Sequence, residues 1–124
     1  MQEKNESKDD RSGTQSRRRA RSSDMNLHQY QELIENIYYR KDSKRGIEKT
    51  FNWLVEEIGE FSRAIRKKER AKIEEEFADC LAWLLSVGSI LGIDAEEAMA
   101  KYRKGCPKCH RSPCRCDEHR NGDS

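Results

Sequence analysis

The chain has 124 residues, of which 34% are hydrophobic and 39% are charged, and its formal net charge at pH 7 is +2. This length suits one domain with a small core, and so small a net charge does not by itself indicate a nucleic-acid-binding protein. No stretch approaches the roughly 20 consecutive apolar residues of a membrane span, and the N-terminus lacks the apolar core of a secretory signal. We therefore expect a cytoplasmic protein that has no membrane partner.

The N-terminal segment, residues 1–23, has one methionine and one alanine as its only apolar side chains. Burial of two such side chains cannot offset the entropy lost on ordering, so we predict a disordered tail. The tail is basic because it contains Arg17, Arg18, Arg19 and Arg21. A short run of charge is more often a solvated tail than a binding arm, and we do not expect nucleic acid as a partner.

Residues 24–105 are predicted to form a helical domain. Apolar side chains recur at helical spacing from Leu27 to Tyr38, which predicts a first helix that ends before the polar stretch RKDSKRG, where Gly46 breaks the run. A second helix is predicted from about Ile47 to Arg66. Its apolar residues alternate four and three apart in a seam of the kind that bundles use, namely Ile47, Phe51, Leu54, Ile58, Phe61 and Ile65.

A third helix repeats this scheme and ends at Gly92. Its seam consists of Ile73, Phe77, Cys80, Leu84, Val87 and Leu91. One continuous helix through both seams would leave an apolar stripe that a chain of this size cannot cover, so a hairpin turn is predicted within residues 67–72. A fourth helix is predicted to start at Asp94, which forms an N-cap and capping box with Glu97. The expected fold is an all-α four-helix bundle whose second apolar face is covered by at least one further copy of the chain.

The second and third helices carry matched pairs of acidic residues. At about 100° per residue, Glu57 and Glu60 lie to one side of the second seam, and Glu76 and Asp79 lie to the corresponding side of the third. In an antiparallel hairpin both pairs face one cleft, and four carboxylates at close range require a cation. Oxygen ligands favour Mg²⁺ or Mn²⁺ over zinc. The alternative is that acidic residues of these helices only form solvated faces. This alternative is strongest for Glu56, Glu74 and Glu75, and Glu56 points nearly opposite the seam.

Two tryptophans, Trp53 and Trp83, lie on the same side of the two seams as the acids. They are candidates for stacking on a nucleobase, although filling the bundle interior is the commoner use of such residues. A di-iron carboxylate site would require Glu-x-x-His motifs, which neither helix contains.

The acidic spacing resembles that of a known family. Glu56-Glu57-x-x-Glu60 followed by Glu76-x-x-Asp79 is similar to the EExxE…ExxD signature of the MazG-like nucleotide pyrophosphohydrolases, and the similarity covers roughly residues 27–104. The resemblance implies an all-α fold, a dimer or tetramer, and Mg²⁺-dependent cleavage of a nucleoside triphosphate into the monophosphate and pyrophosphate. It also implies that the metal ligands are Glu57, Glu60, Glu76 and Asp79, with Glu56 as a supporting residue or a base.

A phosphate substrate also needs cationic side chains. Two groups are candidates: Lys101, Arg103 and Lys104 at the end of the fourth helix, and Arg40, Lys41 and Arg45 after the first. Lys101 matches a lysine that is frequent in the resembling family. Gly105 stands where many of its members carry an asparagine near the nucleotide.

The C-terminal stretch CPKCHRSPCRC, residues 106–116, contains four cysteines, Cys106, Cys109, Cys114 and Cys116. Four thiolates are sufficient for one tetrahedral zinc ion, and His110 or His119 offers a replacement for one of them. A redox-active dithiol or a regulatory disulfide is the alternative. Residues 117–124 are predicted to be disordered.

Two functions are therefore open. The first is a nucleotide pyrophosphohydrolase that removes certain nucleotides from a pool. The second is a non-catalytic helical module that senses a nucleotide or metal and contacts nucleic acid or protein through its basic and cysteine-rich tails.

Overall fold

The computed structural model describes residues 24–117, and every regular element in that part of the chain is helical. The elements are α3 (Leu27–Lys67), α4 (Arg70–Ile90), α5 (Ala95–Met99) and a 3₁₀ helix, η1 (Ala100–Tyr102). The all-α prediction is confirmed. The predicted four-helix bundle is not confirmed, since the described residues form three α-helices, of which α3 is bent. The tail predicted at residues 1–23 lies outside the described residues, as does the C-terminal segment after residue 117.

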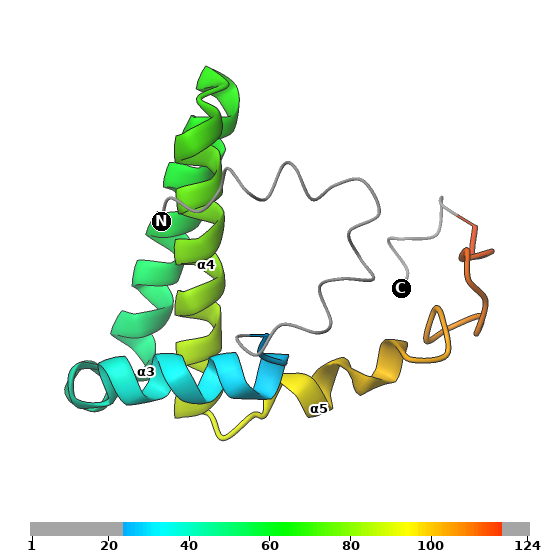
Figure 1. The fold of residues 1–124 in the computed structure, drawn as a ribbon, viewed down its shortest axis with the longest axis horizontal. Helices are drawn as coiled ribbons and strands as arrows, with labels where there is room; N and C mark the ends of the chain where they lie inside the picture. Colours follow the sequence, from blue (N-terminus) through cyan, green and yellow to red (C-terminus); the bar gives the residue numbers. More distant parts are fainter. Residues whose placement is uncertain (1–23, 118–124) are drawn as a thin grey trace.

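Helix α3 is bent at Gly46, which has non-helical torsion angles of φ 86° and ψ 169°. Figure 1 shows the two arms of α3 on either side of this bend, one crossing the base of the molecule and the other running alongside α4. The predicted break at Gly46 is therefore confirmed. The prediction that the first helix ends before RKDSKRG is wrong: helical geometry continues through Arg45, because the segment contains no helix breaker before the glycine.

Buried polar contacts hold this bend in place. The hydroxyl of Thr50, a residue with 0% exposure, donates a hydrogen bond of 2.6 Å to the Gly46 carbonyl. Arg45 Nη1 lies 2.7 Å from Asp42 Oδ1 and 3.3 Å from Thr50 Oγ1. Asp42 is buried as well. A buried charge is costly unless it is paired, and the adjacent Arg45 guanidinium provides the pairing charge. These contacts hold the Arg45 side chain at the bend.

The second arm of α3 and α4 form an antiparallel hairpin. The chain turns at Lys68, whose backbone is left-handed with φ 55°, and the Lys68 amide donates to the Ile65 carbonyl at 3.1 Å. The predicted hairpin turn is thus confirmed. The ring centroids of Phe61 and Phe77 lie 5.9 Å apart, and those of Trp53 and Trp83 lie 6.1 Å apart. The later residue of α3 thus contacts the earlier residue of α4, as antiparallel helices require.

The predicted seams are only partly buried. Leu54 and Val87 are buried, whereas Phe51, Leu84 and Phe77 remain 50%, 53% and 58% exposed. The hydrophobic core of the described residues consists of Leu54, Ala64, Leu85 and Val87. A two-helix hairpin covers one side of each helix, so half of each seam has no covering layer from the described part of the chain.

Buried Gln31 connects the first arm of α3 to the α4–α5 junction. Its amide nitrogen donates to the Ile93 carbonyl at 2.9 Å, and its oxygen accepts from the Ala95 amide at 2.7 Å. Asp94 caps α5 by accepting from the Glu97 amide at 3.0 Å, as predicted. The fourth helix is shorter than expected, since α5 ends at Met99 and continues only as η1.

The junction also contains an exposed, pH-sensitive pair. His28 Nδ1 lies 2.6 Å from Asp94 Oδ1, and this hydrogen bond raises the pKa of His28 above 6.5 and lowers that of Asp94 below 3.8. The contribution of His28 to stability is complete below pH 6.5 and is lost as pH rises through its raised pKa. The contribution of Asp94 is complete above pH 3.8 and is lost as pH falls through its lowered pKa.

We therefore expect this pair to stabilise the protein most between pH 3.8 and 6.5. Denaturant unfolding at a series of pH values should show a larger difference between the wild type and His28→Gln inside this window than at pH 9. NMR titration of the His28 ring should give a pKa above that of a free histidine. Equal differences at every pH would contradict the assignment.

No single helix of residues 24–117 is long and apolar enough to cross a membrane. Helix α4 and residues Ala95–Tyr102 meet the length and hydropathy of a membrane span only as a pair, and the two are bent by 103° at the break between them.

Candidate functional site

Three acidic side chains meet between α3 and α4. Glu57 of α3 and Glu76 and Asp79 of α4 each contribute one carboxylate oxygen, and these oxygens all lie within 4.8 Å of one another. We call these three residues the carboxylate cluster. The antiparallel hairpin brings them together, because it turns the flank of each helix toward the other. The cluster contains three of the four metal ligands implied by the sequence resemblance.

The cluster concentrates negative charge in a partly buried place. Burial is the main cause that raises the pKa of Glu57, followed by the charges of Asp79 and Glu76. Burial also raises the pKa of Asp79, with the charge of Glu75 as the next cause. Burial and neighbouring negative charges therefore both disfavour the ionised forms of Glu57 and Asp79, a cost that a bound cation would offset.

Glu76 gives the strongest indication of a ligand. It is only 7% exposed, and its Oε1 atom makes no hydrogen bond to any described residue. Its other oxygen lies 3.9 Å from Lys72 Nζ, at the limit of an ion pair. A buried carboxylate oxygen with no partner is costly. A hard divalent cation fits this set of oxygen ligands and would satisfy the unpaired atom.

The other two predicted acidic residues lie outside the cluster. Glu60 pairs with Arg63 at 3.3 Å, and both side chains are about half exposed. Its charge nevertheless contributes to the raised pKa of Glu57. Glu56 lines a separate surface hollow, together with Lys49, Asn52 and Trp53.

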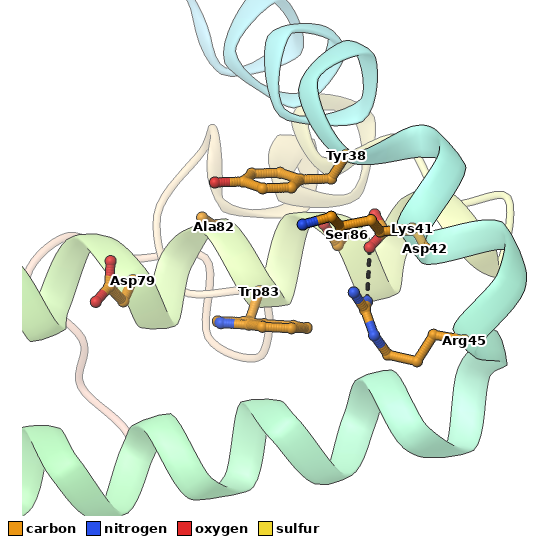
Figure 2. Close-up of a pocket in the computed structure, with 8 residues that line it drawn as sticks. All are labelled: Tyr38, Lys41, Asp42, Arg45, Asp79, Ala82, Trp83 and Ser86. Carbon is orange, nitrogen blue, oxygen red and sulfur yellow. Dashed lines mark hydrogen bonds and ion pairs between the residues drawn. The ribbon is translucent and has the colours of Figure 1, made fainter.

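A second hollow, of about 210 Å³, adjoins the cluster (Figure 2). It is lined by residues from the first arm of α3 and from α4, namely Tyr38, Lys41, Asp42, Arg45, Asp79, Ala82, Trp83 and Ser86. We call it the aromatic hollow. Asp79 belongs both to this hollow and to the carboxylate cluster, so the two sites are continuous.

Aromatic rings form two sides of the hollow. In Figure 2 the rings of Tyr38 and Trp83 lie on opposite sides of the hollow. Trp53 stacks on Trp83 at an interplanar angle of 18° but does not itself line the hollow. The guanidinium of Arg45 lies 4.9 Å from the centroid of a Trp83 ring, which is within cation–π range. Trp83 is therefore held by neighbours while it still faces the hollow.

The structure distinguishes between the two predicted groups of cations. Lys41 and Arg45 line the hollow, whereas Lys101 and Arg103 do not and are exposed. Lys101 lies in η1 and its amine is 5.3 Å from the Tyr102 ring. Sequence reasoning did not identify Tyr38, Asp42 or Ser86 as site residues. The only available signal was the acid–base spacing of Asp42 and Arg45, which are three residues apart.

The four C-terminal cysteines form a second candidate metal site. Their sulfur atoms lie within 4.8 Å of one another, and all four thiols are free. The predicted cysteine-rich segment therefore has an arrangement that could hold a metal ion.

Comparison with known families now adds an independent finding. The model of the MazG nucleotide pyrophosphohydrolase domain matches residues 45–110, which is more than half of the chain. The matched segment contains the whole carboxylate cluster, Arg45 and Trp83, while Tyr38 and Lys41 precede it. None of the curated proteins compared with the chain matches it. The chain belongs to the MazG nucleotide pyrophosphohydrolase family.

Proposed function

We propose that this protein hydrolyses nucleoside triphosphates between the α and β phosphates and depends on Mg²⁺ or Mn²⁺. The observation that carries the proposal is the position of Asp79, which lies in the carboxylate cluster and also lines the aromatic hollow. A cation site is thereby joined to a space with aromatic walls and two basic side chains. This combination matches the three parts of a nucleotide: metal-bound phosphates, further phosphate charge and a planar base.

Glu57, Glu76 and Asp79 are the residues that would hold the cation. When bound there, Mg²⁺ would neutralise phosphate charge and orient the phosphate oxygens. The buried and unpaired Oε1 of Glu76 supports this assignment, because a cation removes the cost of leaving it without a partner.

The aromatic hollow is suited to the rest of the substrate. The faces of Tyr38 and Trp83 offer stacking surfaces to a nucleobase, and such stacking is tolerant of base identity. Lys41 and Arg45 can pair with phosphate oxygens. Arg45 is held by Asp42 and Thr50, so its guanidinium is positioned before the substrate arrives.

The hydrolytic step requires a water molecule and a proton acceptor. The water oxygen bonds to the α phosphorus while the bond from that phosphorus to the bridging oxygen breaks, and pyrophosphate leaves with the electron pair. Asp79 offers one carboxylate oxygen to the cation and also faces the hollow, so its other oxygen can accept the proton of the water. Asp42 also lines the hollow, but its carboxylate pairs with Arg45.

The proposal includes a homo-oligomer. Phe51, Ile58, Phe77 and Leu84 are each about half exposed along the hairpin. Apolar side chains this numerous on a small chain indicate a surface that another molecule covers, and a second copy presents the same seams. Sedimentation of the full chain tests this part of the proposal, which a stable monomer would contradict.

The reaction itself is tested with the full-length chain and a panel of canonical and modified ribo- and deoxyribonucleoside triphosphates. With Mg²⁺ in ¹⁸O-labelled water, we expect pyrophosphate and a monophosphate that carries the label, and no product in the presence of EDTA. Release of orthophosphate and a nucleoside diphosphate would contradict cleavage at the α phosphorus. If none of the triphosphates is hydrolysed, the non-catalytic sensing module becomes the better description.

A further inference from the structure

The C-terminal segment after η1 takes no part in the proposed reaction, yet it has a closely defined geometry. Figure 1 shows this segment leading away from the α3–α4 hairpin, beyond the end of α5. None of its residues lines the aromatic hollow or belongs to the carboxylate cluster. Its cysteines therefore require an explanation that is separate from the nucleotide site.

The sulfur separations match a tetrahedral metal ion. Cys106 Sγ lies 3.8 Å from Cys116 Sγ, and Cys109 Sγ lies 3.9 Å from Cys114 Sγ. Zinc–sulfur bonds of about 2.3 Å place the four sulfurs of a regular tetrahedron about 3.8 Å apart. An iron–sulfur cluster inserts several iron and sulfide atoms between its cysteines and would spread them farther apart than the observed limit of 4.8 Å.

Backbone amides are directed at three of the four sulfurs. Lys108 donates to Cys106 Sγ at 3.3 Å, Arg115 to Cys109 Sγ at 3.3 Å, and Cys116 to Cys114 Sγ at 3.2 Å. Such N–H donors orient thiolate ligands and lower the cost of their negative charge. The backbone is thus arranged to support thiolates at these positions.

Gly105 lies at the start of the segment from Gly105 to Cys116, which we call the cysteine loop. The Cys106 amide donates to the Arg111 carbonyl at 3.0 Å, which brings two backbone segments into contact directly beside Gly105. Gly105 has φ +101°, and a Cβ atom there would lie 2.8 Å from the Arg111 carbonyl oxygen. Only glycine accepts both constraints without a shift of the backbone. Gly105 stands where many family members carry an asparagine, and in this chain it allows the two backbone segments of the cysteine loop to approach each other.

The charges around the loop complement a metal thiolate. Four thiolates and one Zn²⁺ carry a net charge of −2, and the same short segment contains Lys104, Lys108, Arg111 and Arg115. The surrounding basic side chains reduce the electrostatic cost of the assembled site.

From this geometry we propose that Cys106, Cys109, Cys114 and Cys116 bind one zinc ion in a closed tetrathiolate site. Four protein ligands fill the coordination shell and leave no position for water or substrate, so the zinc is structural. Its role is to fold the segment from Gly105 to Cys116, which contains no regular helix or strand. The site is independent of the proposed nucleotide chemistry.

Metal analysis of the full-length protein, purified under reducing conditions without added zinc, tests the proposal. We expect one zinc per chain in the wild type and in Cys80→Ser, which alters the one cysteine outside the loop. The double variant Cys109→Ser/Cys114→Ser should lose the zinc while keeping its helical circular dichroism. Cobalt exchanged into the wild type should give the absorption of a tetrahedral thiolate complex, which the double variant should lack.

Gly105→Ala provides a test that leaves every ligand in place. It should weaken zinc binding by about 10- to 100-fold in competition with a chelator, the range typical for residues that support metal ligands. Three results would overturn the proposal: four reactive thiols with no bound metal, a mass that shows disulfides in place of metal, or one iron per chain. Zinc retained by the double variant would also overturn it, because the metal would then lie elsewhere.

Discussion

Glu76→Gln is expected to reduce pyrophosphate release by about 100-fold or more, since residues that merely support metal ligands already contribute 10- to 100-fold. The substitution keeps the size of the side chain but removes the charge of the most buried member of the carboxylate cluster. It should also abolish the rise in melting temperature that Mg²⁺ gives to the wild type, because a ligand stabilises only a protein that binds it. The two measurements together separate a lost metal site from general damage.

In the absence of metal, Glu76→Gln should not destabilise the protein. Glu57 and Asp79 have raised pKa values, so the ionised cluster destabilises the metal-free fold and this cost falls as pH is lowered through those pKa values. Glu76→Gln removes one of the repelling charges and should leave the metal-free protein at least as stable as the wild type. Thermal unfolding in EDTA at pH 7 and pH 5 measures this.

Glu74→Gln is the matched control for this experiment. Glu74 lies on the same helix two residues away, but it is exposed and pairs with Arg70 at 3.4 Å. Exposed ion pairs contribute little, so activity and the response to Mg²⁺ should stay close to those of the wild type. Full activity in Glu76→Gln, or an equal loss in Glu74→Gln, would show that the cluster is not the metal site.

Gly46→Ala is expected to destabilise the protein by about 1–3 kcal/mol, the usual cost of placing a side chain in a backbone region reserved for glycine. At φ 86° and ψ 169° the strain is in the backbone itself, since a Cβ atom there would meet no heavy atom within 4 Å. The melting temperature should fall by about 4 °C or more for a domain of this size. Circular dichroism during heating measures the change.

The same substitution should impair substrate binding, because the bend at Gly46 places Tyr38, Lys41 and Arg45 opposite α4. We expect a higher KM for the triphosphate even at temperatures where the variant is folded. Gly59→Ala is the control, since Gly59 has helical geometry in the same helix and a Cβ atom there would also meet no heavy atom within 4 Å. That change should be neutral or stabilising by up to about 1 kcal/mol. Equal stability of the two variants would show that Gly46 does not hold a strained bend.

Local features of this protein were predictable from its sequence. The period of 3.6 residues placed Glu57, Glu76 and Asp79 on matching flanks of two helices, and a hairpin between those helices was enough to bring them together. The break at Gly46 and the N-cap at Asp94 depend on residues close in sequence, so both could be predicted. The cysteine loop is equally local, since all four sulfurs come from eleven consecutive residues.

Only the tertiary structure decided how the arms of α3 are placed around α4. The direction of the bend at Gly46 brings Tyr38, Lys41 and Arg45 to Asp79 and Trp83, and no local pattern specifies that direction. Tertiary packing also leaves Lys101 outside the hollow. Helical periodicity gives the side of a helix on which a residue lies. The identity of the residues across from it depends on the crossing of distant segments, which packing determines.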